Sequence, residues 1–303
     1  MPTSINHRWE EHWIDMPEFV VPTRDTKLRN SIDVSDIESV AKQQTSIFPK
    51  YSIYIISLGR YNNPKTAMSL SEMNIPFKIV VEPKEARKYA QVINPKDIII
   101  TPRNFSEDKS GSIPVRNFVL NYSRSIGEKK HWILDDNIGG FGYQKAGRRI
   151  NTKTNGDFFR TCEDFVDRYS NVKLAGIRYR FHHNYVKSPY YLNTRIYSCI
   201  LVDNSIQHSW RGKYNEDTDL SLRVLKDGNC TMLFTWCYCN KSGTQKMRGG
   251  NTDTIYAETN NRYEFAKSLQ EQHPGHVKIV WRYNRWHHLV DYKPFKNNKL
   301  IKK

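Results

Sequence analysis

Between residues 51 and 134 the sequence alternates short β-rich runs with segments of helical spacing, and this alternation constrains the fold more than any other feature. Strands and helices are expected in turn at 51–57, 64–73, 77–81, 84–92, 97–101, 113–126 and 132–134. Such alternation is typical of βαβ units, in which helices connect parallel strands. The chain is therefore predicted to form an α/β, Rossmann-like fold with a central, mostly parallel sheet flanked by helices.

The remainder of the chain is expected to be mixed, without a clean domain boundary after residue 50. Helices are predicted at 158–169, 218–226 and 260–270, and strands at 172–180, 195–202 and 230–239. We divide the chain into an N-terminal appendage (1–50, with a helix at 31–43), a main domain (51–292) and a basic tail (293–303).

Membrane insertion and secretion are both disfavoured by the sequence. No apolar run approaches the roughly 18 residues of a membrane span, and the first residues lack the apolar core of a signal peptide. Five cysteines without framework spacing argue against a disulfide scaffold. A soluble, cytoplasmic protein without a membrane partner is expected, and the sequence does not indicate an oligomeric state.

The chain is strongly basic, with 47 Lys and Arg against 31 Asp and Glu and a net charge of +16. A field of this sign attracts polyanions, and nucleic acid is the obvious one. Basic and aromatic residues also alternate at 178–187 and 281–292, a combination suited to phosphates and stacked bases. The alternatives are an excess that only aids solubility and an aromatic wall around a sugar.

An apolar run from His131 to Leu134 leads directly into Asp135, Asp136 and Asn137. Carboxylates at the mouth of a buried strand need a partner, and hard ions such as Mg²⁺ or Mn²⁺ take oxygen ligands together with a substrate diphosphate. The motif therefore predicts a clamp for a metal and a nucleotide. An ordinary turn, with Gly139 and Gly140 after the acids, is the alternative.

A second acidic cluster, Glu216, Asp217 and Asp219, opens the helix predicted at 218–226. Acidic first-turn residues are favoured by the helix dipole, and Arg223 is spaced to pair with Asp219. Capping explains this pattern well, but it does not explain the preceding Trp210 and Arg211.

Together these segments resemble the GT-A glycosyltransferases. The resemblance rests on Val115-Arg116-Asn117, on the Trp132–Asn137 motif and on Gly212–Arg223, in this order, within residues 51–240. The pattern is also similar to the TET/JBP-associated glycosyltransferases, which include the base J glucosyltransferase and phage relatives. Asn137 departs from the family, since it stands where the last metal aspartate is expected.

The resemblance implies roles on the donor side of the site. Asp136, helped by Asp135, would hold Mn²⁺ or Mg²⁺, and one of the adjacent His287 and His288, assigned as His287, would complete the metal site. A surface or partner contact is the alternative for the two histidines. The residues implied to bind a UDP-sugar are Ser57, Gly59, Arg60, Glu82, Arg116, Asp135 and Arg248. Arg248 lies in a Gly-rich loop that resembles a lid over the diphosphate, with a solvated hairpin tip as the alternative.

On the acceptor side, the resemblance implies that Asp217 is the general base of an inverting reaction, with Glu216 as the runner-up. Acceptor contacts are expected from Trp210, Arg211, Arg178 and Tyr179. The expected reaction transfers a hexose from a UDP-sugar to the hydroxymethyl group of a modified pyrimidine in DNA, 5-hydroxymethylcytosine or 5-hydroxymethyluracil. The alternatives are a GT-A transferase for a glycan or protein and an inactive nucleic-acid-binding module of the same fold.

Overall fold

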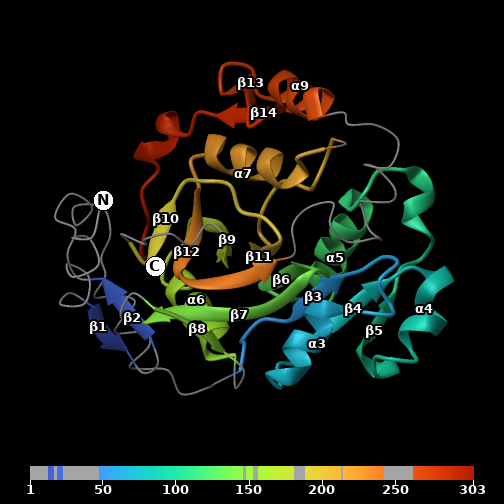
Figure 1. Ribbon diagram of the computed structural model, residues 1–303. Coiled ribbons are helices and arrows are strands. Elements are labelled where there is room, and N and C mark those ends of the chain that lie inside the picture. Colours follow the sequence, from blue (N-terminus) through green and yellow to red (C-terminus); the bar gives the residue numbers. More distant parts are fainter. Residues whose placement is uncertain are drawn as a thin grey trace.

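One large sheet forms the centre of the protein, as its computed structural model shows (Figure 1). The structure describes residues 13–16, 19–22, 48–145, 148–152, 156–180, 188–212, 214–241 and 262–303. Within these ranges ten strands form the sheet: β3 (Ile53–Ile56), β4 (Lys78–Val81), β5 (Ile98–Ile100), β6 (Lys130–Asp135), β7 (Ile138–Lys145), β8 (Arg148–Thr152), β9 (Val172–Tyr179), β10 (Tyr190–Leu192), β11 (Cys199–Asp203) and β12 (Cys230–Lys241). Their order is β5-β4-β3-β6-β11-β9-β12-β7-β8, and β10 pairs with β12 outside this order.

The first half of the sheet follows the predicted βαβ pattern. Strand β3 pairs in parallel with β4 and β6, and β4 pairs in parallel with β5. The connections carry α3 (Lys65–Glu72), α4 (Pro83–Tyr89), α5 (Ile113–Ser125) and the short 3-10 helices η1 (Pro95–Asp97) and η2 (Phe105–Asp108). The helices and strands expected from the sequence in this region are confirmed.

The second half of the sheet is mixed because β11 lies between β6 and β9 and runs antiparallel to both. Strand β9 therefore regains the direction of β6, and β12 is parallel to β9. Strand β7 is antiparallel to β12, and β8 is antiparallel to β7. Among the ten strands of this sheet, only β7, β10 and β11 run opposite to β3, so the sheet is mostly parallel, as expected.

Helices cover both faces of the sheet (Figure 1). Strand alternation places Ile53 and Ile55 in one core with residues of α3 and of α6 (Asp157–Val166). It places Tyr54 and Ile56 in a second core with residues of α5 and of α7 (Glu216–Lys226). Helices α6 and α7 match the helices predicted at 158–169 and 218–226. All five cysteines are buried free thiols.

Two details refine the sequence analysis. Asp136 and Asn137 form a turn, the alternative interpretation of the motif, but Gly139 and Gly140 lie inside β7, at the register shift of its pairing with β12. The strand predicted at 195–202 begins only at Cys199, because Ser198 has a left-handed backbone with a φ of 67°. The sequence motif after Asp136 therefore leads into another strand of the same sheet.

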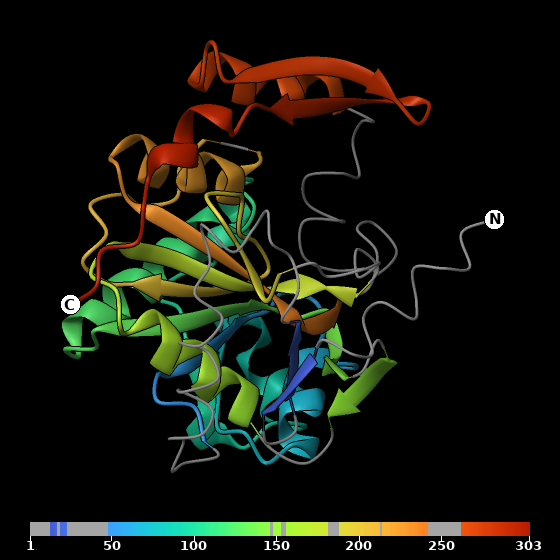
Figure 2. The ribbon, with the colours of Figure 1, turned by 90° about the vertical axis from the view of Figure 1, so that its left-hand side faces the viewer.

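A C-terminal layer lies over α7 (Figures 1 and 2). It contains α9 (Arg262–Gln272), an antiparallel hairpin of β13 (Val277–Arg282) and β14 (Arg285–Val290), and η4 (Lys293–Asn297). A third core joins these elements to α7: Leu222, Leu225, Leu269, Val277 and Phe295. Helix α9 was expected, but the hairpin was not.

The tail after residue 292 lies against the main domain. Phe295 is buried, and the backbone of Ile301 bonds to Ser170 N–H and to the Asn171 side chain, both at 2.9 Å. In the appendage, β1 (Trp13–Met16) and β2 (Phe19–Pro22) form an antiparallel pair. The helix predicted at 31–43 lies outside the described residues.

Over the residues with described positions, no helix has the length and apolar character needed to cross a membrane.

Candidate active site

A cavity of about 450 Å³ opens where the carboxyl ends of β3, β4 and β6 meet the start of α7. Ser57 and Glu82 follow two of these strands, Asp135 ends the third, and Glu216 and Asp217 open the helix. Ligands of open α/β sheets bind outside the carboxyl ends of the strands. The cavity is therefore the candidate active site, and it brings the two acidic motifs of the sequence together.

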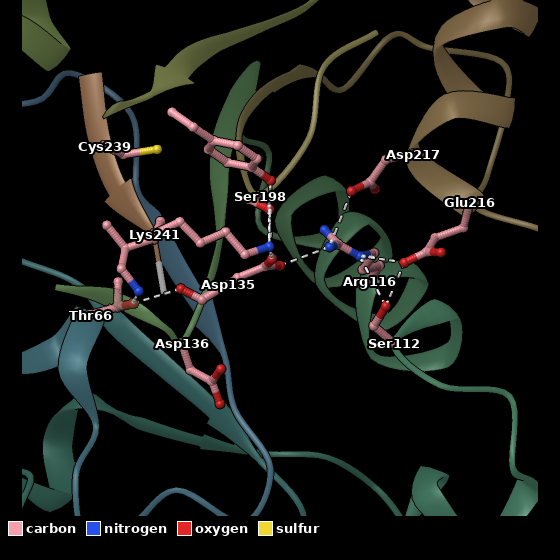
Figure 3. Close-up of polar contacts among 12 residues, drawn as sticks. Thr66, Ser112, Arg116, Asp135, Asp136, Ser198, Glu216, Asp217, Cys239 and Lys241 are labelled. Carbon is pink, nitrogen blue, oxygen red and sulfur yellow. Dashed lines mark hydrogen bonds and ion pairs between the residues drawn. The ribbon is translucent and has the colours of Figure 1, made fainter. Parts of the chain in front are cut away.

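Asp135 is held from both sides by positive charge (Figure 3). Its Oδ1 accepts from Arg116 Nη2 at 2.9 Å, and its Oδ2 accepts from Lys241 Nζ at 2.6 Å and from Ser198 Oγ at 2.7 Å. Burial alone would raise the pKa of Asp135, but Lys241 and Arg116 outweigh burial and hold this pKa below its ordinary value. The carboxylate is therefore ionised and fixed in orientation.

Asp136 points away from this group (Figure 3). Its Oδ2 accepts from Ser57 Oγ at 2.8 Å, and its Oδ1 forms an ion pair with Arg60. Burial raises the pKa of Asp136 above its ordinary value, while Arg60 and Ser57 act to lower it. Two of the predicted nucleotide-binding residues thus surround the predicted metal ligand.

Arg116, from α5, links the first acidic motif to the second (Figure 3). Its Nη2 donates to Asp135 and also lies 3.4 Å from Asp217 Oδ2, and its Nε lies 3.7 Å from Glu216 Oε1. Burial opposes the guanidinium charge, but these three carboxylates keep the pKa of Arg116 above its ordinary value. One buried cation therefore fixes the spacing of the two motifs.

Asp217 combines burial with a fixed orientation. Its Oδ1 accepts from Trp210 Nε1 at 2.9 Å. Burial raises the pKa of Asp217 to about 7, with further raising by Glu216 and Asp135 and a partial offset by Arg116. A carboxyl with this pKa exchanges its proton near neutral pH, as a general base must.

Glu216 is the less favoured candidate base. Its Oε1 accepts from Ser112 Oγ at 2.8 Å. Both Glu216 and Asp217 follow Asn215, whose left-handed backbone (φ 54°) starts α7. The structure therefore places both carboxylates in the cavity, and the burial that raises the pKa of Asp217 favours Asp217 as the base.

Two buried polar atoms of cavity residues have no hydrogen-bond partner within the described part of the chain: Arg116 Nη1, a donor, and Asn137 Oδ1, an acceptor. An unpaired buried donor or acceptor is costly, so such atoms indicate groups that a ligand satisfies. Among described residues, no group of three or more His, Cys, Asp or Glu could hold a metal. The amide oxygen of Asn137 is therefore a cavity acceptor that the described residues leave for a ligand.

The two candidate histidines lie differently. His288 lines the cavity, and burial lowers its pKa to about 4, so its imidazole is neutral. His287 is outside the cavity lining, and its Nε2 accepts from Arg285 Nε at 3.1 Å. The sequence assigned His287 to the metal, but the structure places its neighbour at the site.

The other donor-side residues lie around the strand ends. Glu82 accepts from Ser106 N–H and Ser106 Oγ, both at 2.6 Å, so it orders the chain after β5 as well as lining the cavity. Gly59, with a φ of 70°, donates its N–H to the Glu85 carboxylate at 2.7 Å. The sequence analysis did not single out Glu85. Arg248 and its loop lie outside the described residues.

Of the four predicted acceptor residues, only Tyr179 lines the cavity. Trp210 is 1% exposed, and its indole N–H donates to the Asp217 carboxylate. Arg211 pairs with Asp219 at 3.2 Å, and Arg178 lies over the ring of Tyr191. These three residues therefore do not form the described surface of the cavity.

Several cavity residues escaped the sequence reasoning: Ser112, Arg195, Tyr197, Ser198 and Lys241. Tyr197 lies against Tyr179, with ring centroids 4.8 Å apart, and its hydroxyl accepts from Arg195 Nε at 3.1 Å. The cavity therefore has an aromatic and basic wall, supplied by the segment just before β11 and by the end of β9.

The α/β sheet with paired acids at its carboxyl edge is consistent with the GT-A fold of glycosyltransferases. The model of the TET-Associated Glycosyltransferase family matches residues 51–250, and the chain belongs to this family. It is therefore a glycosyltransferase, and the matched residues include both acidic motifs. No curated protein sequence matches the chain significantly.

Proposed function

We propose that the protein transfers a hexose from a UDP-sugar to the hydroxymethyl group of a modified pyrimidine in DNA, with inversion at the anomeric carbon. The observation that carries the proposal is Asp217, a buried carboxylate with a pKa of about 7, in one cavity with Asp135 and Asp136. This arrangement supports a base at one side of the cavity and a nucleotide site at the other.

Asp217 would take the proton of the acceptor hydroxyl as that oxygen attacks the anomeric carbon. The new carbon–oxygen bond forms while the bond from the sugar to the diphosphate breaks, and the nucleoside diphosphate leaves with the electron pair. Trp210 fixes one oxygen of Asp217 through its indole N–H, so the other oxygen is the one that accepts the proton. Arg116 stabilises the carboxylate before the transfer.

The donor diphosphate would lie at the strand ends, near Arg60, Lys241 and the unpartnered Nη1 of Arg116. The described cavity lining contains five acidic residues and four Lys or Arg, so the cavity alone offers no excess positive charge for a dianionic diphosphate. This balance supports a need for a divalent cation.

Mn²⁺ or Mg²⁺ would be held by Asp136 and the amide oxygen of Asn137, together with oxygens of the donor diphosphate, because the described residues contain no group of three or more His, Cys, Asp or Glu for a metal. Carboxylate, amide and phosphate oxygens suit both ions. When bound, the ion would offset the charge that develops on the departing diphosphate.

A DNA base is the proposed acceptor for two reasons. The chain carries a net charge of +16, which favours a polyanion. Tyr179 and Tyr197 also provide two neighbouring rings in the same cavity as Asp217, and an extruded pyrimidine is read by stacking and hydrogen bonds in a pocket. A glycan or protein acceptor remains the second candidate, because tyrosine walls also bind sugars.

The test is transfer of radiolabelled sugar from a panel of UDP-sugars with Mn²⁺. The acceptors are duplex DNA containing 5-hydroxymethylcytosine, 5-hydroxymethyluracil or neither, and Asp217→Asn is the matched inactive variant. Label on one hydroxymethylated DNA only, lost in the variant, is the expected result. Label on soluble saccharides but on no DNA would show that the acceptor is a glycan rather than DNA. Binding of DNA without any turnover would favour a non-catalytic module.

A further inference from the structure

The β13–β14 hairpin has one face that runs from the core, past the cavity, to the surface. Cross-strand pairing joins Trp281 to Trp286 and Ile279 to His288, and strand alternation puts these four side chains on one face with Val277. Val277 is buried in the core with α7, and His288 lines the cavity. The two tryptophans therefore lie farther along the same face, beyond the cavity wall.

The rest of the described chain covers these tryptophans only in part. Trp281 is 57% exposed and Trp286 39% exposed, and their ring centroids are 5.1 Å apart. Tyr263, from α9, is 41% exposed and lies 5.2 Å from Trp286. We call these three rings the aromatic shelf. Exposed aromatic clusters of this kind indicate a binding surface.

Positive charge lies on the opposite, outward face of the same hairpin. Arg282 and Arg285 form the last cross-strand pair before the turn, and both are exposed, as is Lys278 on the same outward face. The turn itself presents Tyr283, which is 86% exposed. Figure 2 shows the hairpin extended, with its turn at the end away from α7. No carboxylate lies within the hairpin itself between residues 277 and 290.

We propose that the aromatic shelf and the hairpin arginines form the surface that docks DNA beside the cavity. Bases next to the target nucleotide would stack on Trp281 and Trp286, while Arg282 and Arg285 bind the flanking phosphates. His288 connects the two functions, because the strand that carries the shelf also forms part of the cavity wall. The inference rests on the proposed function for its choice of DNA as the occupant.

The shelf is tested by DNA binding, measured separately from transfer. The full chain and its variants are titrated into a fluorescein-labelled duplex with one 5-hydroxymethylcytosine, at several NaCl concentrations, and anisotropy is recorded. Trp281→Ala is expected to raise Kd by about 5- to 100-fold, since stacking on an aromatic ring is lost, and Trp281→Phe by less. The double variant Arg282→Ala/Arg285→Ala is expected to raise Kd and to reduce the slope of log K against log salt by roughly 2.

The matched control is Arg87→Ala/Lys88→Ala, which removes two exposed charges from α4 at a distance from the hairpin (Figure 1). This control and Phe48→Ala, which removes a ring of 48% exposure outside the hairpin, should leave Kd within about twofold of the parent. Hydrolysis of the UDP-sugar in solution checks that each variant is folded. Equal losses in the α4 control, or an unchanged Kd for Trp281→Ala, would overturn the proposed surface.

The outcomes separate the surface from the reaction. DNA binding that depends on Trp281, without sugar transfer to any DNA, would remove the proposed acceptor but retain the docking surface. Transfer to hydroxymethylated DNA that is unaffected by the hairpin variants would retain the reaction and remove the surface. A parent protein that does not bind DNA would remove both.

Discussion

The proton held by Asp217 should control the pH dependence of transfer. The cavity raises the pKa of this carboxyl from 3.8 to about 7. As the general base it must be ionised, so kcat/KM should rise through this pKa and be about tenfold higher at pH 8 than at pH 6. The assay is initial-rate transfer of labelled sugar to hydroxymethylated DNA between pH 5.5 and 8.5, at fixed metal and donor concentrations.

The variant Asp217→Asn should lose transfer without losing its fold. Removal of a general base typically costs about 10²- to 10⁴-fold in rate. An amide oxygen still accepts from the indole N–H of Trp210, and Arg116 retains two carboxylate partners, Asp135 and Glu216. Thermal unfolding at pH 8 should therefore show a Tm no lower than that of the parent.

The same pKa shift predicts how the free energy of unfolding depends on pH. The contribution of Asp217 should change with pH in the direction opposite to that of an ordinary salt-bridged aspartate. Because the folded state binds the Asp217 proton more tightly than the unfolded state, its contribution to stability falls as pH rises from about 4 to about 7. A shift of about three units corresponds to at most ~4 kcal/mol over that window. Asp217→Asn should lack this decline, as urea unfolding at pH 5 and pH 8 would show.

The matched control is Glu216→Gln, which changes the neighbouring carboxylate and leaves Asp217 in place. It should keep the rising pH limb. A flat pH profile in the parent would show that the reasoning from burial is wrong. An Asp217→Asn variant that retains most of its turnover, while Glu216→Gln loses it, would show that Glu216 is the base.

Three further predictions concern other parts of the molecule. Asp136→Ala should weaken Mn²⁺-dependent UDP binding by about tenfold or more, measured by calorimetry, and unchanged affinity would remove Asp136 from the metal site. Asp219 is fully buried, accepts from His273 at 2.8 Å and has a pKa of about 2, so Asp219→Asn should cost about 3 kcal/mol in urea unfolding at pH 7, with the difference shrinking as pH falls toward 2. Gly176→Ala should destabilise by ~1–3 kcal/mol, because the new methyl group would lie 2.6 Å from the carbonyl oxygen of Cys199, and an equally stable variant would show that β11 shifts freely.

The βαβ half of the fold follows from the sequence because its strands are buried on both faces and its helices are amphipathic. Alternate residues of β3 enter two different cores, so apolar side chains are needed at every position of Ile53–Ile56. Local pattern and tertiary environment therefore agree in this region. The two acidic motifs also meet as expected, since strand ends and a helix start converge at one edge of the sheet.

The β13–β14 hairpin was harder to predict because its strands are mostly exposed and its turn uses left-handed backbone at Tyr283 and Asn284. Neither residue is glycine, so the usual sequence mark of a tight hairpin turn is absent. Lys241 was missed for a related reason. It ends a long strand without any motif, and only the pairing of β12 with β9 and β7 brings its ammonium group to Asp135.

Strand phase explains which candidate residues reach the cavity. Arg178 and Tyr179 are adjacent in β9, and His287 and His288 are adjacent in β14, so one member of each pair must face away from a given side. The phase of β14 is fixed by its partner strand, in which Val277 is buried against α7. Every second residue of a strand shares a face, and so do directly paired residues of the two strands. The buried valine therefore places His288 and the two tryptophans on its own face of the hairpin, the side of the cavity. A one-residue shift of β14 against β13 would therefore exchange the histidines and turn Trp286 away from Trp281, so the wall of the site and the proposed DNA surface depend on a single strand register.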